Sequence, residues 1–308
     1  MKIFKTLITI SLIVFSTATI LTAQVTDDII FLHHSCGDNW LNDGLRSVLE
    51  SKIYIDEVND TYYGDVLAPD SGRPPSLGDI PGDNTNMNHW ILWFNDYLQG
   101  IERFESNNGS NKIIMFKSCF PTSNVWSDGE EPGNPFADDQ TLANYRSVYR
   151  HPVGPSGTYN QDGRAYRPLE QVFAAHPDIL FIPITAPPRH FGPDDETNNQ
   201  EASRARTFNN WLKNEWLTGY LATHPDNANV AVFDWFDILA YPSTDAVHPN
   251  RLRAEYGGNS GDSHPNTMAN EYSAGLFSTF LDQAYETWTG ELPQPEPPAQ
   301  PTNFGAVY

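Results

Sequence analysis

The chain has 308 residues, with 18 Lys and Arg against 39 Asp and Glu, and its formal net charge is −21 at pH 7. This balance excludes a general nucleic-acid binder, because phosphate backbones are bound by clustered Lys and Arg, and it disfavours binding to an anionic membrane surface. With 39% hydrophobic and 13% aromatic residues, the composition is that of a globular protein with a sizeable core.

The first 23 residues have the pattern of an export signal. Lys2 and Lys5 provide a positively charged start, residues 7–21 form an apolar run, and Ala23 is a small residue at a suitable cleavage point. A membrane anchor is the alternative, but the run is short for a span of about 20 residues. We therefore expect a secreted or periplasmic protein that has no membrane association after signal cleavage.

Five short apolar runs, rich in β-branched residues, predict buried parallel strands. The runs are residues 29–32, 53–58, 113–116, 179–184 and 230–233. Helical patterns follow or precede them at residues 41–49, 91–101, 169–173 and 208–212, and a final helix at 272–280 has Asn266 or Thr267 as its cap. This alternation predicts an α/β fold, a three-layer α/β/α sandwich around a five-stranded parallel sheet.

Two stretches, residues 64–88 and 120–166, do not fit this alternation, and both leave the carboxyl ends of predicted strands. Open α/β sheets bind ligands on that side, so we expect these loops to surround the functional site. After Trp288 the chain becomes rich in Pro, which predicts a linker over residues 289–308 and the possible start of a further module. One domain is then expected over residues 24–288.

Ser35 is the first candidate catalytic residue, because it lies where the first predicted strand passes into a helix. A serine at such a turn has its hydroxyl clear of the sheet, and its own backbone N–H points to the place where an oxyanion would form. The alternative is that Ser35 only caps the helix, a position that favours serine.

A serine needs a base to accept its proton before it attacks an ester at neutral pH. His264, with Asp262 beside it, lies immediately before the final predicted helix and meets this need. A similar pair, Asp245 and His248, is the alternative. We favour His264 as the base because a helical pattern follows it, whereas none follows His248.

The order of these motifs over residues 28–287 resembles the SGNH (GDSL-like) hydrolase superfamily, and its carbohydrate-esterase members in particular. The resemblance implies that Ser35 is the nucleophile, that His264 is the base and that Asp262 orients it. It also implies an oxyanion hole built from the backbone N–H groups of Ser35 and of Gly64, which follows the second predicted strand.

The third block of the family is altered in this chain, because the asparagine that completes the oxyanion hole is absent at the expected spacing. Asn124 would replace it if the turn is longer, and Ser118 is a second candidate. The usual Gly-Asp-Ser has also become His-His-Ser. We expect His34, Tyr63 and Ser118 to contact the substrate.

Cys36 and Cys119 are the two cysteines of the chain, and they follow the first and third predicted strands. In the flavodoxin-like strand order 2-1-3-4-5 these strands are neighbours, so the geometry allows a disulfide across the end of the sheet. An oxidising compartment would favour that bond. Two buried thiols are the alternative.

Together these features predict an exported serine esterase that removes acetyl or other O-acyl groups from a polysaccharide through an acyl-enzyme, without a cofactor. Aromatic loop residues such as Tyr62, Trp126 and Tyr159 would suit stacking on sugar rings. One alternative is a non-catalytic carbohydrate-binding domain on the same scaffold. Another is a metal-dependent phosphoesterase in which His33 or His34 is a ligand.

Overall fold

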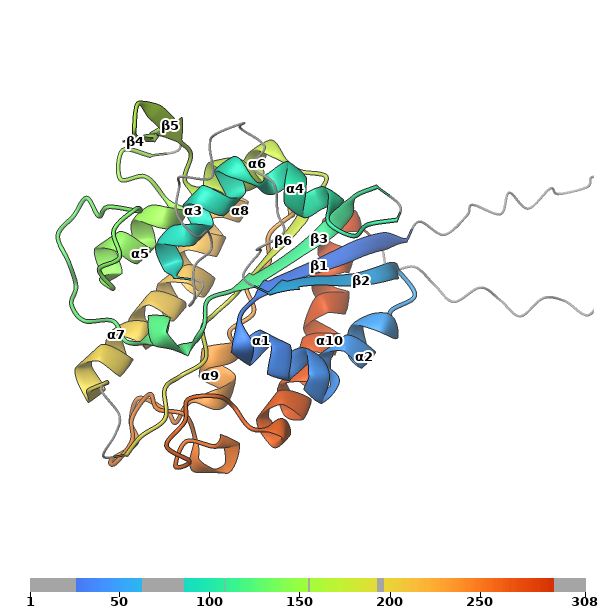
Figure 1. The fold of residues 1–308 in the computed structure, drawn as a ribbon. Helices are drawn as coiled ribbons and strands as arrows, with labels where there is room; N and C mark the ends of the chain where they lie inside the picture. The colour runs from blue at the N-terminus through green and yellow to red at the C-terminus, as the bar shows by residue number, and fades with distance from the viewer. Residues whose placement is uncertain (1–25, 63–85, 108, 155, 193–196, 291–308) are drawn as a thin grey trace, which may run out of the picture.

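A computed structural model gives the structure of the protein (Figure 1). It describes residues 26–62, 86–107, 109–154, 156–192 and 197–290. The predicted export signal, Tyr63, Gly64 and nearly all of the Pro-rich linker lie outside the described residues. None of the helices within the described ranges combines the length and the apolar character that crossing a bilayer requires.

Four parallel strands form the central sheet, in the order β2-β1-β3-β6. They are β1 (Asp27–His33), β2 (Ile55–Tyr62), β3 (Asn111–Lys117) and β6 (Leu180–Ile184). Four of the five predicted strands are therefore confirmed, and they lie in the predicted order. β1 is buried almost throughout because it has a neighbouring strand on each side and helices on both faces.

The fifth predicted strand, residues 230–233, is present only as two isolated parallel bridges to β6. Ala231 N–H donates to Phe181 O at 3.1 Å, and Phe233 N–H donates to Pro183 O at 3.0 Å. The return bond from position 183 cannot form because proline has no N–H to donate. The prediction of five full strands is therefore wrong: this segment runs beside β6 without completing a ladder.

Helices cover both faces of the sheet (Figure 1). One face carries α1 (Ser35–Trp40), α2 (Arg46–Glu50), α9 (Trp235–Leu239) and α10 (Thr267–Thr289). The other carries α3 (Met87–Asp96), α4 (Leu98–Arg103), α5 (Leu142–Tyr149), α6 (Leu169–Ala175), α7 (Asn199–Asn210) and α8 (Leu217–Thr223). Alternate side chains of β1 point to opposite faces of the sheet. Ile29 and Phe31 pack with the helices of the α1 and α10 face, and Ile30 and Leu32 pack with those of the α3 and α7 face.

The helical patterns read from the sequence all coincide with helices. α1 and α2 are separated by a kink at Asp43 and Gly44, where the backbone leaves the helical region, and Gly44 has a positive φ of 117°. α7 continues into α8 through the π-helical turn Trp211–Trp216. Asn266 caps α10, because its side chain accepts a hydrogen bond from the backbone N–H of Ala269 at 3.0 Å. That cap decides between the two residues that the sequence offered for the start of the last helix.

The predicted loop over residues 120–166 contains more regular structure than its composition indicated. It includes α5 and a short hairpin of β4 (Tyr159–Gln161) and β5 (Arg164–Tyr166). Tyr145 and Tyr149 of α5 are buried against the core, although a tyrosine-rich and Gly-rich stretch reads as polar. The prediction of an irregular loop is therefore wrong for this part of the chain.

Candidate active site

Ser35 is the first residue of α1, and it lies two positions after the last residue of β1. The turn between strand and helix is tight. A Cβ at position 37 would lie only 2.4 Å from His33 Cβ, so the close approach of the helix to the strand end requires Gly37. The half-buried Ser35 thus begins its helix at the carboxyl end of the central strand, as the sequence predicted.

Ser35, His264 and Asp262 form a continuous hydrogen-bonded chain. Ser35 Oγ lies 2.8 Å from His264 Nε2, and His264 Nδ1 lies 2.7 Å from Asp262 Oδ1. A carboxylate can only accept hydrogen bonds, so Nδ1 of the neutral ring carries the proton and Nε2 is left as an acceptor. The structure therefore brings together the three residues that the sequence placed in one catalytic set, and it orients the serine hydroxyl toward the imidazole.

Asp262 is the most exposed of the three, with 60% of its side chain accessible against 26% for His264. Burial alone would raise the pKa of its carboxyl, but hydrogen bonds from the ring and the backbone N–H of His264 lower that pKa below its ordinary value. Asp262 is therefore charged at neutral pH, where it favours a proton on Nδ1 of His264.

A second histidine and serine hold the segment that carries His264. His190 N–H donates to Ser263 Oγ at 3.2 Å, and His190 Nδ1 lies 2.7 Å from the same oxygen. Both side chains are buried. The chain just before His264 is thus attached to the loop after β6, while the cap at Asn266 fixes the chain just after it. Sequence reasoning missed His190.

Two further residues that the sequence analysis missed are Phe120, which lies beside the imidazole, and Arg189, which packs on Phe120. The Phe120 and His264 rings pack edge to face with centroids 5.1 Å apart, and the Arg189 guanidinium lies 5.7 Å from the Phe120 centroid. Both Phe120 and Arg189 are partly exposed. Phe120 follows β3 and Arg189 follows β6, so their place after predicted strands is the signal that could have identified them.

The alternative base, His248, does not take part in this arrangement. Its ring stacks on Phe191 with centroids 3.7 Å apart, and its backbone N–H donates to Asp245 Oδ1 at 2.7 Å. Asp245 therefore organises a turn of the backbone, whereas Asp262 bonds to an imidazole. The preference for His264 over His248 agrees with this geometry.

His33 and His34 separate at the end of β1, as neighbouring residues of an extended chain do. His33 is buried, and its Nε2 lies 3.1 Å from a carboxylate oxygen of Asp60, which is also paired with Arg46. His34 instead faces Ser35, with its Nδ1 2.8 Å from Ser35 Oγ. Across the described part of the chain, no group of three or more His, Cys, Asp or Glu side chains is placed to hold a metal ion.

The residues predicted for the oxyanion hole have different outcomes. Gly64 lies outside the described residues, so its role stays a prediction. The side-chain amide of Asn124 is oriented so that both its nitrogen and its oxygen form hydrogen bonds. The nitrogen donates to Glu201 Oε2 at 3.0 Å, and the oxygen accepts from Trp126 Nε1 at 3.3 Å. These contacts direct the amide toward α7, and they do not support the predicted oxyanion role of Asn124.

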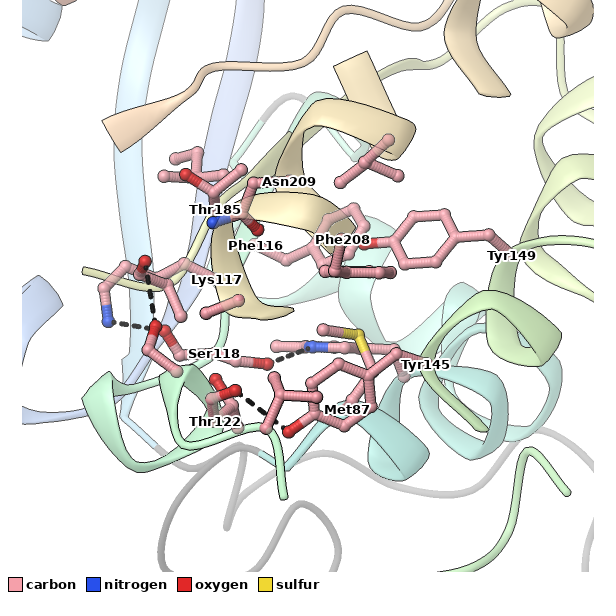
Figure 2. Close-up of a pocket in the computed structure, with 17 residues that line it drawn as sticks. Met87, Phe116, Lys117, Ser118, Thr122, Tyr145, Tyr149, Thr185, Phe208 and Asn209 are labelled. Carbon is pink, nitrogen blue, oxygen red and sulfur yellow. Dashed lines mark hydrogen bonds between the residues drawn. The ribbon is translucent and has the colours of Figure 1, made fainter. Parts of the chain in front are cut away.

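Ser118, predicted to contact the substrate, is buried instead. Its Oγ accepts a hydrogen bond from Trp90 Nε1 at 2.8 Å, and it lines a cavity of about 10 Å³ behind β3, which has room for about one water molecule (Figure 2). Lys117, with its amine turned to the carbonyl of Ser118, also lines this cavity. Ser35, His264 and Asp262 do not line this cavity. The substrate role given to Ser118 is therefore wrong.

Tyr63, the third residue predicted to contact substrate, lies outside the described residues, but its neighbour Tyr62 reaches the site. Tyr62 ends β2 and is paired with His33 in the parallel register. Its ring centroid is 5.2 Å from that of His34. The second strand therefore contributes an aromatic side chain next to the serine.

Cys36 and Cys119 lie together at the ends of β1 and β3, as predicted, but they do not form a disulfide. Both are free thiols, and their Sγ atoms are 3.6 Å apart, whereas a disulfide bond measures about 2.05 Å. The hydrogen bond with Cys36 and the charge of Lys117 hold the pKa of the Cys119 thiol below its usual value. The predicted disulfide is therefore wrong, and the alternative of two buried thiols describes the structure.

The assembled site contains a serine hydroxyl, an imidazole and a carboxylate in hydrogen-bonded order at the carboxyl end of a parallel sheet. Such a set can activate a hydroxyl for attack on a carbonyl carbon. No protein-family model matches the chain, and no curated protein is significantly similar to it in sequence. The functional argument therefore rests on the geometry of the site.

Proposed function

We propose that the protein is an exported serine ester hydrolase of SGNH type. The observation that carries the proposal is the contact of Ser35 Oγ with His264 Nε2 at 2.8 Å, together with the 2.7 Å contact of His264 Nδ1 with Asp262. A serine hydroxyl bonded to an imidazole that a carboxylate orients is the arrangement that activates an alcohol near neutral pH. The strand order β2-β1-β3-β6, with the serine after β1, supports the SGNH assignment.

In the proposed reaction, Ser35 Oγ attacks the ester carbonyl carbon while its proton moves to His264 Nε2. Asp262 stabilises the imidazolium, and the backbone N–H of Ser35, with that of Gly64 as the predicted partner, donates to the oxyanion. His264 then gives the proton to the leaving alcohol, which leaves an acyl-serine. Water loses its proton to His264, attacks the acyl carbon and releases the acid.

For the substrate we propose an O-acetylated polysaccharide. Trp126 is 50% exposed, and it lines an open hollow together with the polar side chains of Asn134 and Asp139. An aromatic face beside amide and carboxylate groups suits a sugar ring. Trp126 lies only a few residues after Phe120, which packs against His264. We propose that a chain of sugars bound at the serine extends toward this hollow.

Hydrolysis of p-nitrophenyl acetate tests the reaction. We expect turnover by the wild type, a loss of at least about 10³-fold in Ser35→Ala, and no effect of EDTA. Ser51→Ala is the matched control, because Ser51 Oγ bonds to Val48 O on the surface. Absence of turnover in the wild type would favour the carbohydrate-binding alternative, and loss on EDTA treatment would favour the metal-dependent phosphoesterase.

A further inference from the structure

Ser35 Oγ is in contact with two imidazoles. His264 Nε2 lies 2.8 Å from it on one side, and His34 Nδ1 lies 2.8 Å from it as well. We propose that His34 is a further catalytic residue, whose Nδ1–H donates to Ser35 Oγ and stabilises the charge on this oxygen when it is a leaving group. The inference rests on the proposed esterase function and assigns a second histidine to the reaction.

The direction of both hydrogen bonds follows from the protons available. Asp262 accepts from His264 Nδ1, so His264 Nε2 is an acceptor and takes the single hydroxyl proton of Ser35. The remaining contact at 2.8 Å joins Oγ, which then has only lone pairs to offer, to Nδ1 of His34. That contact is a hydrogen bond only if Nδ1 of His34 carries the proton and donates it.

The position of His34 is determined by the elements around it. It lies between β1 and α1 with an extended backbone, φ −121° and ψ −171°, which turns its side chain away from the buried His33. Its ring lies against that of Tyr62 at the end of β2, with centroids 5.2 Å apart and planes at 31°. Two neighbouring strands therefore hold the donor beside the nucleophile, and no movement is needed to form the bond.

The donor acts differently in the two halves of the reaction. During acylation the His34 N–H already donates to the Ser35 hydroxyl before attack, so the donor lowers the barrier little as the C–Oγ bond forms and the proton passes to His264. In the acyl-serine, Oγ is an ester oxygen and a weaker acceptor, so the same bond strengthens more on the way to the transition state. During deacylation the C–Oγ bond breaks, its electron pair returns to Oγ, and the oxygen is negative until His264 protonates it. A fixed N–H stabilises that charge, because hydrogen bonds to charged groups are stronger than those to neutral ones.

Two variants separate the donor from the ring. His34→Phe keeps an aromatic ring against Tyr62 but removes the N–H. His34→Asn can place its amide N–H near the position of Nδ1. With p-nitrophenyl acetate we expect His34→Phe to release one equivalent of p-nitrophenol in a burst and then turn over about 10- to 100-fold more slowly than wild type. We expect His34→Asn to recover most of that loss.

The outcomes distinguish this inference from the proposed function. If the wild type lacks Ser35-dependent turnover, both are overturned. If the wild type turns over and His34→Phe matches it, or slows acylation and deacylation equally, only the role of His34 is overturned. ¹⁵N NMR of the imidazoles supplies a readout that does not depend on turnover. We expect His34 to be protonated at Nδ1 in the wild type, and a bare Nδ1 would overturn the inference.

Discussion

At the scale of single residues, the members of the proposed catalytic set differ in their exposure to solvent. His264 is packed against Phe120, donates a hydrogen bond from Nδ1 to Asp262 and accepts one at Nε2 from Ser35, whereas Asp262 is mostly open to solvent. Water screens the interaction between an exposed carboxylate and an imidazolium. We therefore expect Asp262 to matter less for the rate than a buried aspartate in the same role.

Replacement of Asp262 tests this expectation. Asp262→Asn should lower kcat by about 10²-fold, which is less than the loss of about 10⁴-fold known for a buried triad aspartate. The kinetics of ester hydrolysis at pH 7 measure the effect. Asp245→Asn is the matched control, since Asp245 accepts from backbone N–H groups near His248, away from the serine. An unchanged kcat would show that the loop alone orients His264.

At the scale of elements, the site depends on how β1, β2 and α2 are joined. Asp60 on β2 accepts a hydrogen bond from the buried His33 of β1 and pairs with Arg46 of α2. The hydrogen bond from His33 is the main cause that lowers the pKa of Asp60, and the Arg46 hydrogen bond acts in the same direction against the effect of burial. Asp60 therefore links β1, the strand that precedes Ser35, to β2 and α2.

A lowered carboxyl pKa predicts how stability depends on pH. The contribution of Asp60 to the free energy of unfolding is fully present above the pKa of its carboxyl in the unfolded chain, about 3.9. It is lost as the pH falls through the lower pKa of the same carboxyl in the folded protein. Asp60→Asn should reduce the free energy of unfolding at pH 7 by about 1–3 kcal/mol, and its stability should fall less than that of wild type below pH 4. Urea denaturation between pH 7 and pH 3 measures both effects. The exposed Asp56 on the same strand provides the control, Asp56→Asn, and equal acid sensitivity of Asp60→Asn and wild type would contradict the argument.

At the scale of the whole molecule, the formal charge of −21 gives the protein a net negative field. Such a field slows the approach of anionic substrates, and salt screens it over a distance of about 10 Å at 0.1 M ionic strength. Neutral substrates are unaffected by the field. The proposed substrate, a polysaccharide, would therefore be favoured when its sugars are uncharged.

A comparison of two esters at different salt concentrations tests this effect. We expect kcat/KM for an acetate ester that carries a carboxylate to rise with NaCl between 10 and 300 mM, because screening removes repulsion, while that for neutral p-nitrophenyl acetate stays constant. A salt response shared by both esters would indicate a change in the enzyme instead of a change in association.

Much of the fold could be predicted because local pattern and tertiary structure agree. The apolar runs that became β1, β3 and β6 are buried on both faces, and a continuous apolar run is typical of a strand buried in this way. β2 lies at the edge of the sheet and is only partly buried. The exceptions have local causes. Pro183 removed one donor from the ladder with residues 230–233, and the tyrosines of α5 turned a polar-looking stretch into part of the core.

For the site, the sequence alone predicted the three residues that the structure brings together: a serine after a strand, a histidine before a helix and an aspartate beside it. Only the tertiary structure decided which groups meet them. It chose His264 over His248, moved Ser118 into the interior, left Cys36 and Cys119 as thiols and set His34 against the nucleophile. The reason is physical: residue type and spacing specify local conformation, whereas contacts of 3 Å between distant segments depend on how strands and loops pack together.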